Sequence, residues 1–212
     1  MQEVIDSFVT LWVVIDPIGT VPVFIAVTAG LDAAARRKTA FQAALVSAGV
    51  LLFFLVFGQL LIDALDIGLN SFQVAGGIVL FLFALTMIFG ESKPETDQKQ
   101  SEQYNAADTE KPNPAIFPLA VPSLASPGAM LAIVMLTDNN QVGIADQALT
   151  AGVMLVVIAA AFLFMLFADP IIRLIGHAGS AIVSRVMGMI LASVAANAVL
   201  SAILEIVKTG QL

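Results

Sequence analysis

The stretch Asp16-Pro17-Ile18-Gly19-Thr20 lies in the middle of an apolar run, from Phe8 to Ala29, that is long enough to cross a membrane. An Asp at an N-cap, a Pro at the first helical position and a small residue beside them form a pattern that begins a helix. Because this helix start falls near the centre of the run, the sequence predicts a broken membrane helix. Its second half would begin near the bilayer midplane with backbone N–H groups that the helix itself does not satisfy.

The composition places the whole chain in a membrane. Of its 212 residues, 59% are hydrophobic and 12% are charged, whereas an ordinary globular domain has about 25% charged residues. There is no Cys and only one His, so the sequence predicts neither a disulfide nor a metal site built from those side chains. A net charge of −7 is not the signature of a nucleic-acid-binding protein.

Six apolar segments have about the length that a bilayer core requires, which is roughly 20 residues for a helix. We place them near residues 5–29, 39–62, 70–90, 115–137, 147–168 and 181–207. The expected fold is therefore all-α, a polytopic membrane protein with six transmembrane segments.

A polar, charged stretch, residues 91–113, divides the six segments into two sets of three. Its composition is typical of a flexible, solvated loop. The expected organisation is a first repeat in residues 1–90, a flexible cytoplasmic loop in 91–114 and a second repeat in 115–212.

Basic residues predict the orientation. Lys and Arg collect after the first, third and fifth segments, and only Lys208 lies on the opposite side. Basic loops stay cytoplasmic. We therefore expect loop 91–113 to be cytoplasmic, both termini to lie outside, and the protein to reside in the cell (inner) membrane.

The second set of segments repeats the interruption of the first. The fourth segment is broken near its middle by Ser126-Pro127-Gly128, where Ser can cap a helix and Pro fits its first turn. Pro17 precedes Gly77 by nearly the same distance as Pro127 precedes Gly188. Three segments per set invert the second set relative to the first, and matched broken helices in inverted repeats point to a transporter's binding site.

This topology would bring two half-helix N-termini together near the midplane, each with an effective charge of about +0.5. Asp16 is the carboxylate placed deepest in a segment, so it should face protein or a watery cavity. Two positive helix ends beside one Asp are complementary to a zwitterion. The helix ends would bind its carboxylate, and Asp16 would bind its ammonium. The alternative is that Asp16 only caps its own half-helix.

Several separated motifs resemble those of the MarC family of integral membrane proteins, over essentially the whole chain except loop 91–113. They are Asp16 to Phe24, Ala75-Gly76-Gly77-Ile78, Pro118 to Pro122, Ser126-Pro127-Gly128-Ala129, and Arg185 with Gly188. The resemblance implies transport of small neutral amino acids such as glycine and alanine with an ion gradient. Many members carry Asn at the position of Thr20 and Gly at that of Ser126, so the resemblance leaves the exact substrate open.

The leading hypothesis is a secondary active transporter that holds a small zwitterion between the two half-helix starts and alternates access across the bilayer. No cofactor is expected, and the coupling ion could be H⁺ or Na⁺. A channel or passive facilitator for a small polar solute is the alternative, and no constellation of catalytic side chains indicates an enzyme. Lipid is an expected partner, nucleic acid is not, and the oligomeric state stays open. The predicted substrate-binding residues are Asp16, Pro17, Ile18, Gly19, Thr20, Ser126, Pro127, Gly128 and Ala129, with Gly76, Gly77, Gly188 and Asn197 packing nearby.

Overall fold

The computed structural model describes residues 2–28, 31–64, 69–89, 113–137 and 143–210. Every element within these ranges is helical. The elements are α1 (Gln2–Ile15), α2 (Thr20–Val27), α3 (Ala33–Ala64), α4 (Leu69–Phe89), η1 (Ala115–Leu124), α6 (Pro127–Leu136), α7 (Ile144–Leu166) and α8 (Ala168–Thr209). The charged loop expected at 91–113 lies almost entirely outside the described residues.

The described helices contain five segments that are long and apolar enough to cross a membrane, and six when the bent pair η1 and α6 counts as one. Each lies within a few residues of a segment predicted from the sequence. The all-helical, polytopic fold class is confirmed, whereas the inverted repeat stays a prediction.

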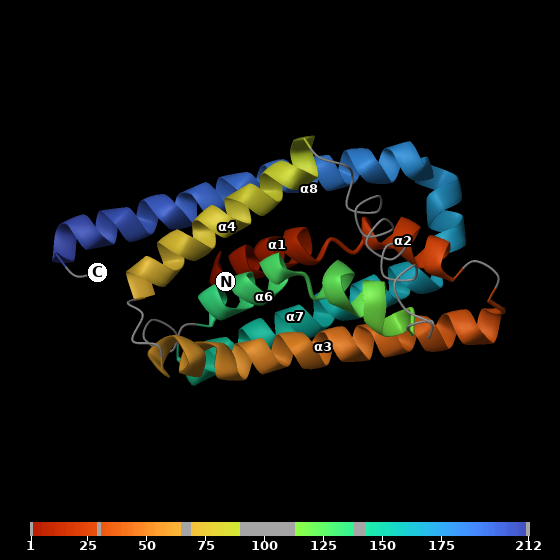
Figure 1. The fold of residues 1–212 in the computed structure, drawn as a ribbon, viewed down its shortest axis with the longest axis horizontal. Coiled ribbons are helices and arrows are strands. Elements are labelled where there is room, and N and C mark those ends of the chain that lie inside the picture. The colour runs from red at the N-terminus through yellow and green to blue at the C-terminus, as the bar shows by residue number, and fades with distance from the viewer. Residues whose placement is uncertain (1, 29–30, 65–68, 90–112, 138–142, 211–212) are drawn as a thin grey trace, which may run out of the picture.

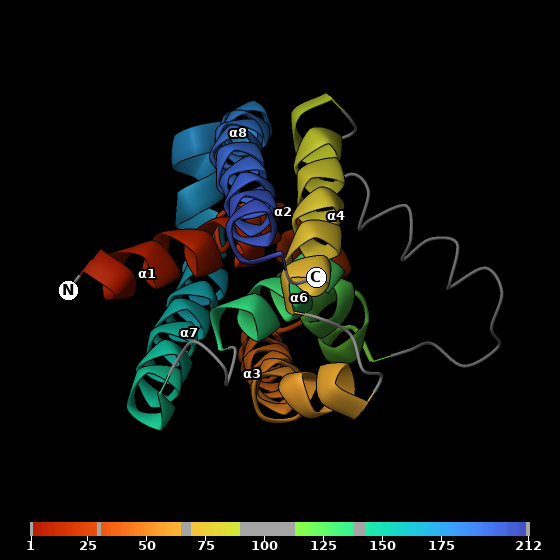
Figure 2. The same ribbon diagram turned by 90° about the vertical axis from the view of Figure 1, so that its left-hand side faces the viewer.

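The two interrupted segments form the middle layer of the molecule (Figures 1 and 2). There α1 packs on α6 and α2 packs on η1, so the segments run side by side in opposite directions. The pair α4 and α8 covers one side of this layer, and α3 and α7 cover the other. The first segment is accordingly 67% buried, against 17 to 33% for the four uninterrupted ones. Irregular backbone at membrane depth is tolerated only when protein surrounds it.

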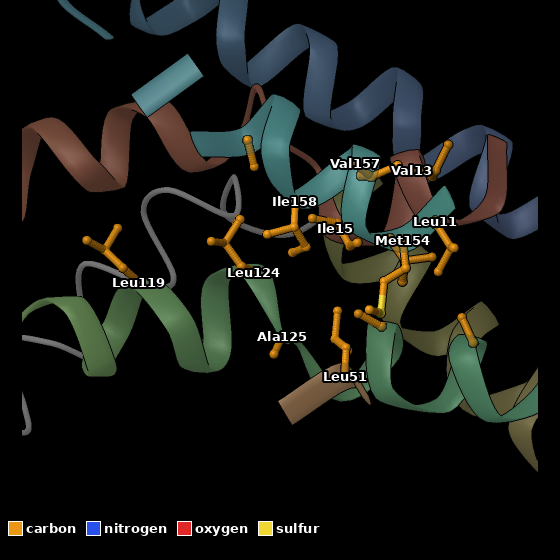
Figure 3. Close-up of a cluster of buried hydrophobic side chains, with 14 of the residues drawn as sticks. Leu11, Val13, Ile15, Leu51, Leu119, Leu124, Ala125, Met154, Val157 and Ile158 are labelled. Carbon is orange, nitrogen blue, oxygen red and sulfur yellow. The ribbon is translucent and has the colours of Figure 1, made fainter. Parts of the chain in front are cut away.

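An apolar core lies around the interruptions (Figure 3). It is contributed by several elements that are distant in sequence, and its members include Leu11, Val13 and Ile15 of α1, Leu51 of α3, Leu119 and Leu124 of η1, and Met154, Val157 and Ile158 of α7. This core excludes water from the polar groups at the two breaks.

The helix starts differ at the two breaks, and one expectation was wrong in detail. Ser126 caps α6 as expected, because its hydroxyl accepts the Ala129 N–H at 3.1 Å and Pro127 occupies the first turn. The second half of the first segment, however, begins at Thr20 and not at Pro17. The cause is a turn that precedes α2: the Asp16 carbonyl accepts the Thr20 N–H at 3.2 Å, and residues 17–19 form that turn.

Two further irregularities were not expected. In η1 the backbone is extended at Phe117 and Val121, each of which precedes a proline, a position where helical geometry is disfavoured. The two halves of the fourth segment, η1 and α6, meet at an angle of 52° at the predicted break. The connection between the fifth and sixth segments, expected near 169–180, is instead helical from Ala168, with a break at Gly176, where φ is 69°.

Candidate functional site

Asp16 lies at the first break with a backbone φ of 50° and only 1% of its surface exposed. Its carboxylate accepts two hydrogen bonds. Oδ1 accepts the Gly19 N–H at 3.0 Å, and Oδ2 accepts the Ser184 hydroxyl of α8 at 2.8 Å. Among the residues that the structure describes, Asp16 is the one fully buried carboxylate.

Buried hydroxyl groups join the first break to the second. The Thr20 hydroxyl donates to the Asp16 carbonyl at 3.1 Å and lies 3.2 Å from the Ser123 hydroxyl at the end of η1. From the other side, the Ser126 hydroxyl lies 3.5 Å from the Val14 carbonyl oxygen at the end of α1. The two breaks therefore lie beside each other. Their polar side chains, those of Asp16, Thr20, Ser123 and Ser126, are enclosed in an apolar core.

The two half-helix starts differ in how many amide donors they leave for a ligand. At α2 the N–H groups of Gly19, Thr20 and Val21 all bind acceptors within residues 16–18. Pro22, the next residue, has no N–H. The expectation of free donors at this start is wrong for this conformation, because Asp16 and its turn already satisfy them.

At α6, by contrast, one donor of the first turn is left. Pro127 has no N–H, the Ala129 N–H binds the Ser126 hydroxyl, and the Met130 N–H binds the Ser126 carbonyl at 2.9 Å. The structure gives no acceptor for the Gly128 N–H among the described residues. The α6 start thus keeps one amide donor without an acceptor among the described residues, and the α2 start is the end beside the carboxylate.

The remaining predicted residues fall into two groups. Pro17 is buried, Ile18 is half-buried and Ala129 is buried, so they enclose the breaks. The glycines pack helices together: a Cβ on Gly77 would lie 2.6 Å from the Val199 side chain of α8, and one on Gly188 would lie 2.8 Å from Met87 of α4.

Of the other two predicted packing residues, Gly76 faces α6, since a Cβ there would lie 3.1 Å from Met135, whereas Asn197 does not pack as expected. Asn197 lies on the exposed face of α8, away from the breaks.

Sequence reasoning missed Ser184 and Ser123. Ser184 is fully buried and lies one helical turn before Gly188, which was singled out, but no pattern in the sequence relates a lone Ser to Asp16. Ser123 stands three residues before the Ser126 cap, in a segment whose irregular backbone was not foreseen. In the described ranges no three His, Cys, Asp or Glu side chains gather to hold a metal ion.

A charged pair joins the first turns of α3 and α8 and so links the two sets of segments. The Arg36 guanidinium of α3 donates to both Asp169 carboxylate oxygens of α8, at 2.9 and 3.1 Å. The hydrogen bond from Arg36, with its charge, holds the pKa of the Asp169 carboxyl below its ordinary value. Arg36 also lies 5.5 Å from the ring centre of Phe24, beside a cavity of about 140 Å³ that Arg37 helps to line.

Fold and site together define a polytopic helical membrane protein in which two interrupted segments meet around a buried carboxylate. The chain belongs to the MarC family: the model of the MarC family integral membrane protein matches residues 1–207. A relative from Bacillus subtilis, UPF0056 membrane protein YvbG, is 33% identical over 91% of this chain and 90% of its own length. One from Archaeoglobus fulgidus is 31% identical over 94% and 91%. UPF0056 inner membrane protein MarC of Salmonella arizonae is 26% identical over 96% and 95%. No solved structure matches the chain.

Proposed function

We propose that this chain is a secondary active transporter of small neutral amino acids of the glycine and alanine class. The observation that carries the proposal is the buried Asp16 carboxylate beside the second break, where the Gly128 N–H at the start of α6 meets no acceptor among the described residues. A zwitterion has one group for each. Its ammonium would bind Asp16, and its carboxylate would bind the α6 start, where the helix end contributes an effective charge of about +0.5.

The space around the second break favours a small substrate. A Cβ on Gly128 would lie 3.2 Å from both Phe83 and Val14, so apolar side chains tightly bound the second break. Ser126, buried at the same break, adds a hydroxyl. A bulky side chain on the substrate would have to displace more of these packed groups than glycine or alanine would.

Transport would follow from rocking of one set of three segments against the other, with H⁺ or Na⁺ as the coupling ion. The inverted repeat is part of this proposal, as is the orientation with both termini outside. In the structure α1 begins and α8 ends toward the same side of the bundle (Figure 1), which is consistent with both termini on one side of the membrane, and the basic loops favour the outside. The Salmonella relative's description as an inner membrane protein supports the location.

The test is uptake into proteoliposomes that contain the purified protein. We expect labelled glycine or alanine to accumulate above its external concentration when an H⁺ or Na⁺ gradient is imposed. Equilibration without accumulation would indicate a passive facilitator. Absence of any flux for all small neutral amino acids under either gradient would refute the proposal.

A thermal-shift screen of the amino acids in detergent gives an independent readout, because a ligand that binds the native state raises its apparent stability. Asp16→Asn should weaken glycine binding, so that a much higher glycine concentration is needed for the same shift. Asp6→Asn, at an exposed Asp of the preceding helix α1, is the matched control and should leave the shift unchanged. An unchanged shift in a folded Asp16→Asn variant would mean that Asp16 acts only as a cap.

A further inference from the structure

Ser184 stands out because it is the contact between α8 and the buried carboxylate. Its hydroxyl, with no exposed surface, donates to Asp16 Oδ2 at 2.8 Å across 168 positions of sequence. We propose that Ser184 is a positioning residue for Asp16: it fixes the direction in which the carboxylate meets a substrate ammonium. This inference rests on the proposed function and adds a residue to it.

The direction of the Ser184 hydroxyl is unusual for this protein. A Ser or Thr inside a helix commonly donates to the carbonyl four residues earlier. The hydroxyls of Thr28, Ser47 and Thr137 do so here, at 2.6 to 2.7 Å. Ser184 instead gives its one proton to a carboxylate of another helix, which makes a stronger, charge-assisted bond.

The two bonds hold the carboxylate from opposite directions and leave it capacity for a ligand. The Gly19 N–H fixes Oδ1 from within the same turn, and Ser184 fixes Oδ2 from α8. An ionised carboxylate can accept about four hydrogen bonds. Two positions therefore remain for an ammonium, and their orientation is set by the two bonds already made.

The contact depends on close packing at Gly19. A Cβ at that position would lie 2.7 Å from the Ser184 Oγ and 2.7 Å from the Asp16 Cγ, closer than real Cβ contacts. One turn further along α8, Gly188 packs against Met87 of α4. The helix that carries Ser184 is thus held tightly at the first break and again at α4, so it can act as a fixed support for the carboxylate.

The experiment compares Ser184→Ala with Ser184→Thr, which keeps a hydroxyl. Ser193→Ala is the matched control, because Ser193 is exposed on the same helix and donates to its own Met189 carbonyl. We expect Ser184→Ala to weaken glycine binding about tenfold or more, as for a lost hydrogen bond to a charged group. Ser184→Thr should retain most of the wild-type affinity. In both Ser184 variants the maximal transport rate should change less than the KM. Ser193→Ala should bind glycine like the wild type.

A double-mutant cycle separates positioning from a general structural role. If Ser184 acts through Asp16, Ser184→Ala should have almost no effect on affinity in an Asp16→Asn background, because contacting residues are non-additive. Equal weakening in both backgrounds, or no weakening by Ser184→Ala alone, would overturn the inference. If Asp16→Asn does not fold, failure of Ser184→Thr to restore affinity would overturn it as well.

These experiments distinguish failure of the Ser184 inference from failure of the proposed transport function. If the wild type binds no small amino acid, the proposed function fails. The same cycle measured by thermal unfolding then still reports whether Asp16 and Ser184 are coupled. Additive effects in that measurement would refute the contact itself.

Discussion

A single methyl group at position 19 tests the fit between the first break and α8. Gly19 has φ −66° and ψ −21°, which any residue adopts, so Gly19→Ala introduces no backbone strain. By restricting the unfolded chain, the change should stabilise the protein by about 0.4–1 kcal/mol if the methyl group fits. It does not fit here, because the new Cβ would lie 2.7 Å from both the Asp16 Cγ and the Ser184 Oγ.

The expected magnitude follows from two opposing terms. Overpacking a filled site costs about 1–3 kcal/mol, and a carboxylate pushed off one hydrogen bond loses roughly 1.5–3 kcal/mol more. After subtracting the backbone gain, we expect Gly19→Ala to lower the free energy of unfolding by about 1.5–5.5 kcal/mol. For a chain of this length, each 1 kcal/mol moves Tm by about 2–4 °C.

The assay is thermal unfolding of the purified protein in detergent, with Gly49→Ala as the control. Gly49 is exposed in the middle of α3, and a Cβ there would meet no atom within 4 Å. Replacing a helix-interior Gly by Ala should raise stability by about 0.5–1 kcal/mol. The two variants should therefore shift Tm in opposite directions. A Gly19→Ala protein as stable as Gly49→Ala would show that the carboxylate and α8 are not in close contact.

Three further predictions concern other parts of the molecule. Gly128→Val should abolish glycine uptake while Tm falls only modestly, since Phe83 bounds the site there; uptake at the wild-type rate would remove the second break from the substrate site. Gly77→Val should lower Tm by the most, because its side chain would overlap α8, and an unchanged Tm would contradict that packing. Arg36 lowers the pKa of Asp169 in the folded state, so the pair stabilises the protein above the unfolded pKa of about 3.9 and ceases to do so as pH falls below the folded value. Asp169→Asn should therefore lower Tm slightly near neutral pH, by less than about 1 kcal/mol for so exposed a pair, and a difference that persisted in strong acid would refute this account.

The sequence predicts the segments well because membrane insertion depends on length and hydropathy, which are local properties. The helix ends were less predictable. The second segment was expected from residue 39, yet α3 begins at Ala33 and includes Arg36 and Arg37. Charged residues limit the part of a helix that lies in lipid, but they do not end the helix itself.

The position of each break was also predictable, because proline and its neighbours restrict the backbone locally. The geometry at the first break was not, since Asp16 can either cap a helix at Pro17 or hold a turn that precedes Thr20. In the structure, the turn is contacted by Ser123 of η1 and Ser184 of α8. No local rule relates residues so far apart in sequence.

The contacts at the breaks have a consequence for how the protein folds. A buried polar group without a partner destabilises the native state by about 1–3 kcal/mol. At the breaks, the hydroxyl of Thr20 contacts Ser123, the carboxylate of Asp16 binds Ser184, and the hydroxyl of Ser126 lies against a carbonyl of α1. Each contact joins one set of three segments to the other. The Asp16 carboxylate and the Ser123 and Ser126 hydroxyls therefore gain these partners only when both sets of segments have come together.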